Sequence, residues 1–193
     1  NNQLAFSSEG VTLAGYKDAA EYVTYYPFAP YQFTLLSKIF EAIRRHGATG
    51  RHLSQGERSL LDAFQPAVKG ILNHDINRLV PVFDFYSSIE SFLDSTVRHA
   101  IDNADKQVGR LFETFDIKLL KALFLIKYIP EMVKGKVDNL ATLCVEEIDT
   151  DKLVLKRRIQ ESLMRLEKQN LVSRNGDEWM FLTNEEQDIA REI

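Results

Sequence analysis

Residues 151–169 constrain the fold of this chain more than any other stretch. One apolar stripe recurs there at helical spacing and consists of Leu155, Ile159, Ser162, Leu163 and Leu166. Between Lys152 and Lys168 there are six basic and two acidic side chains, a net charge of +4 on one helix. The whole chain carries a net charge of −4. The pattern therefore predicts an amphipathic helix whose polar side is a local cationic surface.

Two short β-forming runs follow this helix and flank Asn175-Gly176. An Asn-Gly pair between β-forming residues is a strong hairpin signal, because both residues tolerate a positive φ. Alternation along the second run places Trp179 and Phe181 on one face, and we expect that face to be in the core.

Two shorter helices precede the basic one. The first is expected over residues 117–128 and is stopped by Pro130, and the second over residues 137–148. Helix, helix, basic helix and hairpin is the order of a winged helix-turn-helix, whose third helix usually enters the DNA major groove. We therefore predict a winged helix-turn-helix with a small β-hairpin over residues 116–193.

The first 115 residues are expected to form a separate helical subdomain, so that the fold is mainly α. The clearest amphipathic helix there runs from Pro30 to Arg45. Residues 84–115 keep an apolar helical repeat that predicts one long helix or two in line, with Gly109 as a break.

Composition excludes several classes of protein. No apolar run reaches the roughly 18–20 residues that a membrane span needs, so we expect no membrane partner. The single cysteine, Cys144, excludes an internal disulfide, fits a reducing cytoplasm and lies on an apolar helix face as a small core residue. The four histidines are scattered without metal-ligand spacing, so no metal site is expected. The start, without Met or signal peptide, is expected for an excised piece of a longer chain.

Any contact with DNA must come from a local patch. Residues 1–115 carry 11 basic and 13 acidic side chains, and residues 116–193 carry 13 and 15. The candidates for phosphate or base contact are Lys156, Arg157, Arg165 and Arg174. A solvated or protein-binding face is the alternative for the same surface.

The run from Ser54 to Arg58 has three interpretations. Ser54 and Glu57 have the spacing of a capping box at a helix N-terminus. The serine-glycine-glutamate order is also that of the ABC-type ATPase signature, where a helix N-terminus meets a nucleotide phosphate. In the third, Arg58 is a sensor-like arginine that reaches a nucleotide bound elsewhere. No phosphate-binding loop accompanies the run, so this fragment alone is not expected to bind or hydrolyse ATP.

Three stretches, residues 26–33, 46–65 and 181–189, together resemble the large P-loop ATPase of bacteriophage-exclusion (BREX) systems, of the BrxC/PglY type. The resemblance spans most of the chain, and residues 46–65 are its most specific part. It implies an internal, AAA-lid-like region without the Walker motifs, with ATP and Mg required only by the parent chain. It also implies Arg58 as a nucleotide-sensing residue, with Arg51 second.

The expected function is that of a non-catalytic lid plus winged-helix region of a phage-defence ATPase, located in the cytoplasm. Its expected partners are DNA or other BREX proteins, and a homo-oligomer can form through the parent ATPase. Two rival hypotheses are a DNA-binding transcriptional regulator and a pure protein–protein interaction module.

Overall fold

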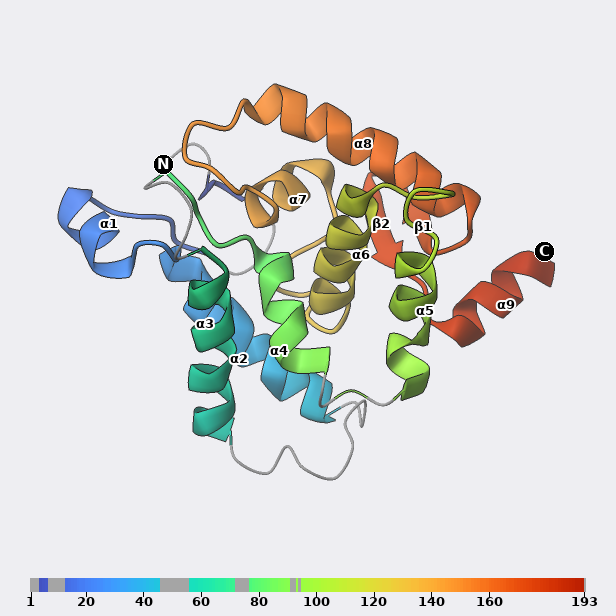
Figure 1. The fold of residues 1–193 in the computed structure, drawn as a ribbon, viewed down its shortest axis with the longest axis horizontal. Coiled ribbons are helices and arrows are strands. Elements are labelled where there is room, and N and C mark those ends of the chain that lie inside the picture. The colour runs from blue at the N-terminus through green and yellow to red at the C-terminus, as the bar shows by residue number, and fades with distance from the viewer. Residues whose placement is uncertain are drawn as a thin grey trace.

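The computed structural model describes residues 4–6, 13–45, 56–71, 77–90, 93 and 95–192, with the backbone alone in 56–61 and at 192 (Figure 1). The first helices are α1 (Ala19–Tyr25), α2 (Pro30–Arg45), α3 (Gly56–Ile71), α4 (Tyr86–Glu90) and α5 (Ser95–Asp105). They are followed by α6 (Thr114–Lys127), α7 (Val137–Leu143), α8 (Lys152–Lys168), β1 (Val172–Asn175), β2 (Glu178–Phe181) and α9 (Asn184–Glu192). The predicted mainly α fold with a small antiparallel hairpin is confirmed.

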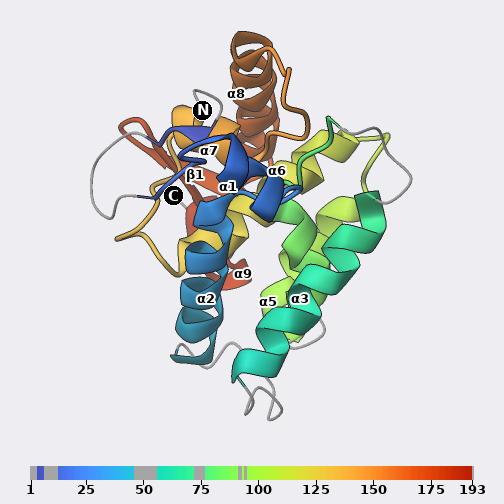
Figure 2. The ribbon, with the colours of Figure 1, turned by 90° about the vertical axis from the view of Figure 1, so that its left-hand side faces the viewer.

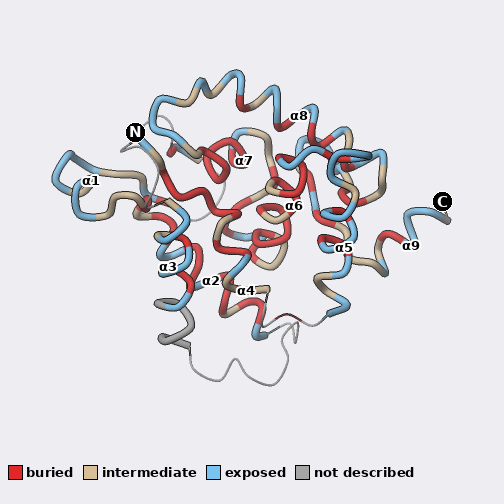
Figure 3. The backbone as a smooth tube through the Cα atoms, in the orientation of Figure 1, coloured by how far each residue is buried: buried red, intermediate tan, exposed pale blue. Residues whose placement is uncertain are grey.

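Helix α6 is the centre of the packing. Ten of its fourteen residues are buried, and Figure 3 shows this buried path through the middle of the molecule. Helices α5, α7 and α8, strand β2 and the 3-10 turn Val82–Phe85 all pack against it. A helix that is apolar all round has to be covered all round, so the apolar sequence of α6 determines that its neighbours surround it.

The basic helix α8 forms where the sequence predicts it. Its N-terminus is capped by the Asp151 carboxylate, which accepts hydrogen bonds from the amides of Leu153 (2.9 Å) and Val154 (3.2 Å). Its buried residues are those of the predicted stripe, and they pack against α6 and α7. One side of α8 therefore belongs to the core.

Helix α7 is shorter than predicted, and the predicted helical end at Ile148 is wrong. The helix stops at Leu143, and Ile148 is exposed. The chain after the helix pairs instead with an earlier segment, through bonds from the Leu79 amide to the Glu146 carbonyl (2.8 Å) and from the Ile148 amide to the Asn77 carbonyl (3.0 Å). These long-range hydrogen bonds replace the last turn of the helix.

The hairpin forms at the predicted place, but its turn is one residue further along. Asn175 pairs with Glu178, so the two loop residues are Gly176 and Asp177. Gly176 has the positive φ (63°), at the position where type II′ hairpin turns place glycine. Trp179 and Phe181 are buried, which confirms the predicted inward face.

The predicted single or in-line helix over residues 84–115 is wrong. The 3-10 turn Val82–Phe85 covers the start of this range, and α4 and α5 are separate helices. After α5 the chain reverses in a tight turn in which the Gly109 amide donates to the Phe112 carbonyl (2.9 Å), with Gly109 at a φ of 83°. The sequence keeps a helical apolar repeat across these breaks because α4 and α5 each bury apolar side chains on one side.

The predicted boundary near residue 115 lies between packed elements. Buried residues on both sides of it belong to one hydrophobic cluster, and α6 touches α4 and α5 as well as α8. The division into residues 1–115 and 116–193 stays a prediction.

Among the helices that the structure describes, none is long and apolar enough to cross a membrane.

Candidate functional site

The side of α8 that points away from α6 is uncovered by the described part of the chain. We call the exposed residues on this side between Leu153 and Met164 the outer face, and they are Leu153, Val154, Arg157, Gln160, Glu161 and Met164. Leu153, Val154 and Met164 expose 75%, 59% and 67% of their surface. Helix α8 lies along one edge of the molecule in two perpendicular views (Figures 1 and 2), and Figure 3 shows the exposed residues along it. Three large aliphatic side chains in water on one helix mark a candidate interaction surface.

Arg165, one of the predicted DNA contacts, is instead held by α6. Its Nε and Nη2 atoms donate to the two carboxylate oxygens of Asp116, at 2.9 and 2.8 Å, and Glu113 lies 3.4 Å from Nη2. Burial by itself would raise the pKa of Asp116. The hydrogen bonds from Arg165 and the Glu113 amide, together with the Arg165 charge, hold that pKa below its usual value. The guanidinium is therefore committed to a structural ion pair.

Lys156 also has a partner inside the protein. Its Nζ lies 2.6 Å from the carboxylate of Asp138, which belongs to the first turn of α7. Lys152, on the same flank of α8, donates to the Thr142 hydroxyl (3.4 Å). Burial, assisted by the nearby charge of Lys156, lowers the pKa of Lys152. These two contacts join this flank of α8 to α7. A DNA phosphate would therefore have to compete with Asp138 for Lys156.

The two remaining DNA candidates differ from each other. Arg174 donates from Nε to the carbonyl of Gly176 (2.7 Å), and its guanidinium lies 5.4 Å from the Trp179 ring, so it is engaged within its own hairpin. Arg157 is exposed and forms no hydrogen bond or ion pair with the residues that the structure describes. Of the four candidates, Arg157 alone presents an uncommitted charge to that described surface.

Acidic residues border the N-terminal end of α8. Asp149 and Asp151 are exposed immediately before the helix, Asp138 lies beside Lys156, and Glu147 is exposed in the preceding turn. Recognition helices usually approach DNA through their N-terminal residues. Carboxylates at that end repel phosphates, so the local charge is less suited to DNA than the helix composition predicts.

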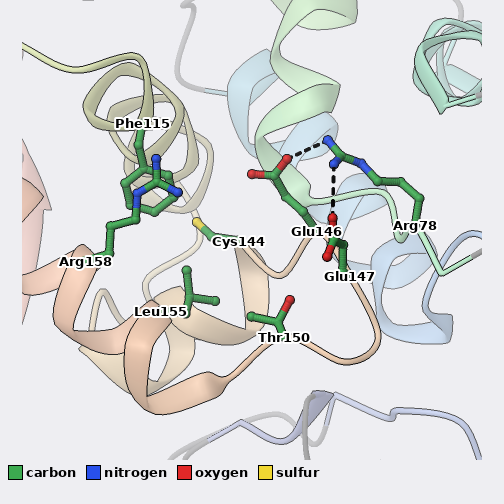
Figure 4. Close-up of a pocket in the computed structure, with 8 residues that line it drawn as sticks. All are labelled: Arg78, Phe115, Cys144, Glu146, Glu147, Thr150, Leu155 and Arg158. Atoms are coloured by element: carbon green, nitrogen blue, oxygen red, sulfur yellow. Dashed lines mark hydrogen bonds and ion pairs between the residues drawn. The ribbon is translucent and has the colours of Figure 1, made fainter. Parts of the chain in front are cut away.

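A polar cavity of about 240 Å³ lies between α8, the end of α7 and the segment at Arg78 (Figure 4). Its lining consists of Arg78, Phe115, Cys144, Glu146, Glu147, Thr150, Leu155 and Arg158. Arg78 lies 2.6 Å from Glu146 and 3.9 Å from Glu147, and Lys118 lies 3.2 Å from Glu146. Burial, with a smaller effect of the Glu146 charge, raises the pKa of the Cys144 thiol well above its usual range. The thiol is therefore protonated at neutral pH. Arg78 is already paired with the two glutamates of the cavity, and the Arg158 guanidinium lies over the Phe115 ring, 4.1 Å from its centroid.

The side chains of the two predicted nucleotide-sensing residues lie outside the part of the chain that the structure describes. Arg58 lies in α3, but its side chain is outside the described residues, and Arg51 lies outside them altogether. The expected capping pair of Ser54 and Glu57 falls in the same region.

Metal ligands were not expected from the sequence. In the part of the chain that the structure describes, no group of three or more His, Cys, Asp and Glu side chains could hold a metal ion. His46, His52 and His74 lie outside that part, and His99 is on α5.

The aliphatic residues of the outer face were missed in the sequence, although the signal was present. Leu153 and Met164 are eleven residues apart, which is three helical turns, and they lie opposite the Leu155–Leu166 stripe on a helical wheel. A second apolar stripe on an otherwise polar side therefore indicates a contact surface. No family model matches this sequence, and no solved structure matches its fold.

Proposed function

We propose that this chain is a non-catalytic interaction region of a phage-defence ATPase of the BREX type. In this proposal residues 1–115 form a lid-like subdomain and residues 116–193 a winged helix-turn-helix. The order of α6, α7, α8 and the hairpin supports the winged helix, as does the packing of α8 against both preceding helices. The sequence resemblance described above supports the parent ATPase.

The outer face of α8 is the observation that carries the functional part of the proposal. It combines the exposed side chains of Leu153, Val154 and Met164 with the free charge of Arg157. Exposed aliphatic side chains gain free energy when another protein covers them, whereas a DNA phosphate cannot supply that gain. We therefore propose contact with protein, within the defence complex, as the main role of this face.

Leu153→Asp in the intact ATPase is expected to abolish protection of cells against phage, with at least a tenfold rise in plaque number. An aspartate in the first turn of α8 is compatible with the helix, because its charge is favourable near a helix N-terminus. The lost contact is therefore intermolecular. The measurement is plating efficiency, alongside protein level.

Ile189→Asp is the matched control, because Ile189 is also an exposed aliphatic residue on a helix (62%) but lies on α9. We expect it to retain protection. Full protection by the Leu153→Asp variant at a normal protein level would contradict the proposed role of α8.

DNA binding is a second candidate, favoured by the exposed and unpaired Arg157. If Arg157 meets a phosphate, binding of duplex DNA to the chain should fall steeply with salt, and Arg157→Ala should lower the salt slope by about one. We expect from the bordering carboxylates that binding at low salt is weak and that Arg157→Ala leaves the slope unchanged. A slope change of about one would favour DNA over protein.

The proposal extends to Arg58, with Arg51 second, as sensor residues for a nucleotide in the parent chain. ATP and Mg would be bound by that parent and not by this region. ATP turnover of the intact ATPase tests this role, and an Arg58→Ala variant with an unchanged rate would remove it.

A further inference from the structure

Two pairs of residues on the outer face of α8 are arranged symmetrically along the helix. Leu153 lies toward one end and Met164 toward the other, and both are largely exposed. Between them Arg157 and Glu161 carry opposite charges, and neither forms a hydrogen bond or ion pair within the described structure. Both pairs are centred within one residue of Ile159. The face is therefore self-complementary when it meets a reversed copy of itself.

We propose that the outer face of α8 binds the same face of a second copy of this chain, with the two helices antiparallel. A two-fold axis near Ile159 would bring residues equally distant from that level together. Leu153 then contacts Met164 of the second copy, and Arg157 meets Glu161 of the second copy. Symmetry repeats each contact, so two aliphatic contacts and two ion pairs form at once.

Charge complementarity is the reason for choosing a second copy as the occupant. An acidic partner would satisfy Arg157 but leave Glu161 facing a like charge, and a basic partner would do the reverse. DNA would meet Glu161 and the carboxylates before α8 as well as Arg157. A reversed copy satisfies both charges at once, and its antiparallel helix dipole is also favourable.

The affinity of the proposed dimer is limited by the small area that two α8 helices can bury. One helix pair buries less than the roughly 1,600 Å² of a standard protein–protein interface. We therefore expect weak association of the isolated chain, with a dissociation constant on the order of 100 µM. Self-association through this face rests on the proposed function, for which a second copy of the chain would be the protein partner. Dimerisation is measured on the purified chain, whereas phage protection is measured in cells, so the two can fail separately.

A charge-swap experiment tests the pairing directly by sedimentation equilibrium. Arg157→Glu places two glutamates opposite each other at both symmetric sites, and Glu161→Arg places two arginines there. Each single variant is expected to weaken the dimer at least about tenfold. The double variant, Arg157→Glu with Glu161→Arg, restores opposite charges and is expected to return to within about threefold of the wild-type constant. A double variant as weak as the singles would overturn the pairing.

A disulfide experiment tests the antiparallel register. In this arrangement residue 153 faces residue 164 of the second copy, whereas identical positions lie about 15–18 Å apart along the helix. Disulfides require Cα atoms within about 7 Å. A mixture of Leu153→Cys and Met164→Cys chains is therefore expected to form a disulfide-linked dimer under mild oxidation, and neither variant alone should do so. The native Cys144 is buried and serves as an internal blank.

The remaining outcomes also decide the question. A wild-type chain that stays monomeric at millimolar concentration would overturn the inference, as would equal cross-linking in the mixture and in each single variant. Salt-sensitive DNA binding through Arg157 by a monomer would overturn it and give the surface to DNA. Loss of phage protection in Leu153→Asp cells together with a monomeric chain would leave the proposed function standing with another protein partner.

Discussion

Arg165→Ala is expected to lower the free energy of unfolding by about 2–3 kcal/mol. Arg165 donates two hydrogen bonds to Asp116, whose side chain is fully buried, while about a third of the Arg165 side chain is exposed. Removing the arginine leaves a buried carboxylate that keeps the hydrogen bond from the Glu113 amide (2.9 Å) but loses its cationic partner. Leaving the Asp116 carboxylate buried and unpaired is costly, so the loss of stability exceeds that for breaking a solvent-exposed ion pair. Urea unfolding at neutral pH measures the loss.

The same substitution is expected to change the pH dependence of stability. In the native protein the pKa of Asp116 is below its usual value, so its contribution to stability is present above about pH 4 and is lost as pH falls through the folded pKa. Without Arg165, burial dominates and raises the pKa of Asp116. The loss of stability on acidification should therefore begin at a higher pH in Arg165→Ala than in the wild-type chain.

Arg157→Ala is the matched control, since it removes an arginine from the same helix that is exposed and unpaired in the described structure. At low protein concentration its effect on the unfolding free energy should stay within about 0.5 kcal/mol. If Arg165→Ala were no more destabilised than this control, the ion pair would not be what joins α8 to α6.

Gly135→Ala is the second substitution with a large expected effect, a loss of about 3 kcal/mol or failure to fold. A Cβ atom at Gly135 would lie 3.0 Å from the carbonyl carbon of Trp179 and closer still to its oxygen. Both obstacles are backbone atoms of β2, so no side-chain rotation relieves the clash. The chain must separate from β2 and lose the bond from the Trp179 amide to the Gly135 carbonyl (3.0 Å). Thermal unfolding should show a midpoint lower by about 10 °C.

Gly70→Ala provides the comparison for this prediction. Gly70 lies in α3, and a Cβ atom there meets nothing within 4 Å. Alanine has the higher helix propensity, so this variant should be stabilised by up to about 1 kcal/mol. Equal midpoints for the two alanine variants would show that Gly135 is not required by the close approach of β2.

Some of the fold could be predicted because it depends on residues near one another in the chain. The apolar stripe of α8 lies within seventeen residues, and the same side chains are buried in the structure. The hairpin was predictable for the same reason, since Gly176 provides the positive φ of its turn. The turn itself was misplaced by one residue, because the register depends on which side chains of β2 reach the core.

The end of α7 and the break between α4 and α5 could not be predicted in the same way. The residues after α7 have helical spacing, but the hydrogen bonds of Glu146 and Ile148 to the segment at Asn77 and Leu79 replace the last turn. A pairing between segments nearly seventy residues apart leaves no local signature in either one.

The sequence by itself determined that an amphipathic helix with a buried apolar stripe and six cations precedes a hairpin, since periodicity and turn chemistry are local properties. Only the tertiary structure decided what those cations do. Arg165 became the partner of a buried carboxylate and Lys156 that of Asp138, whereas Arg157 remained in solvent. The physical reason is that a charge is neutralised by whichever opposite charge the fold brings within a few ångströms, and here those partners come from other helices.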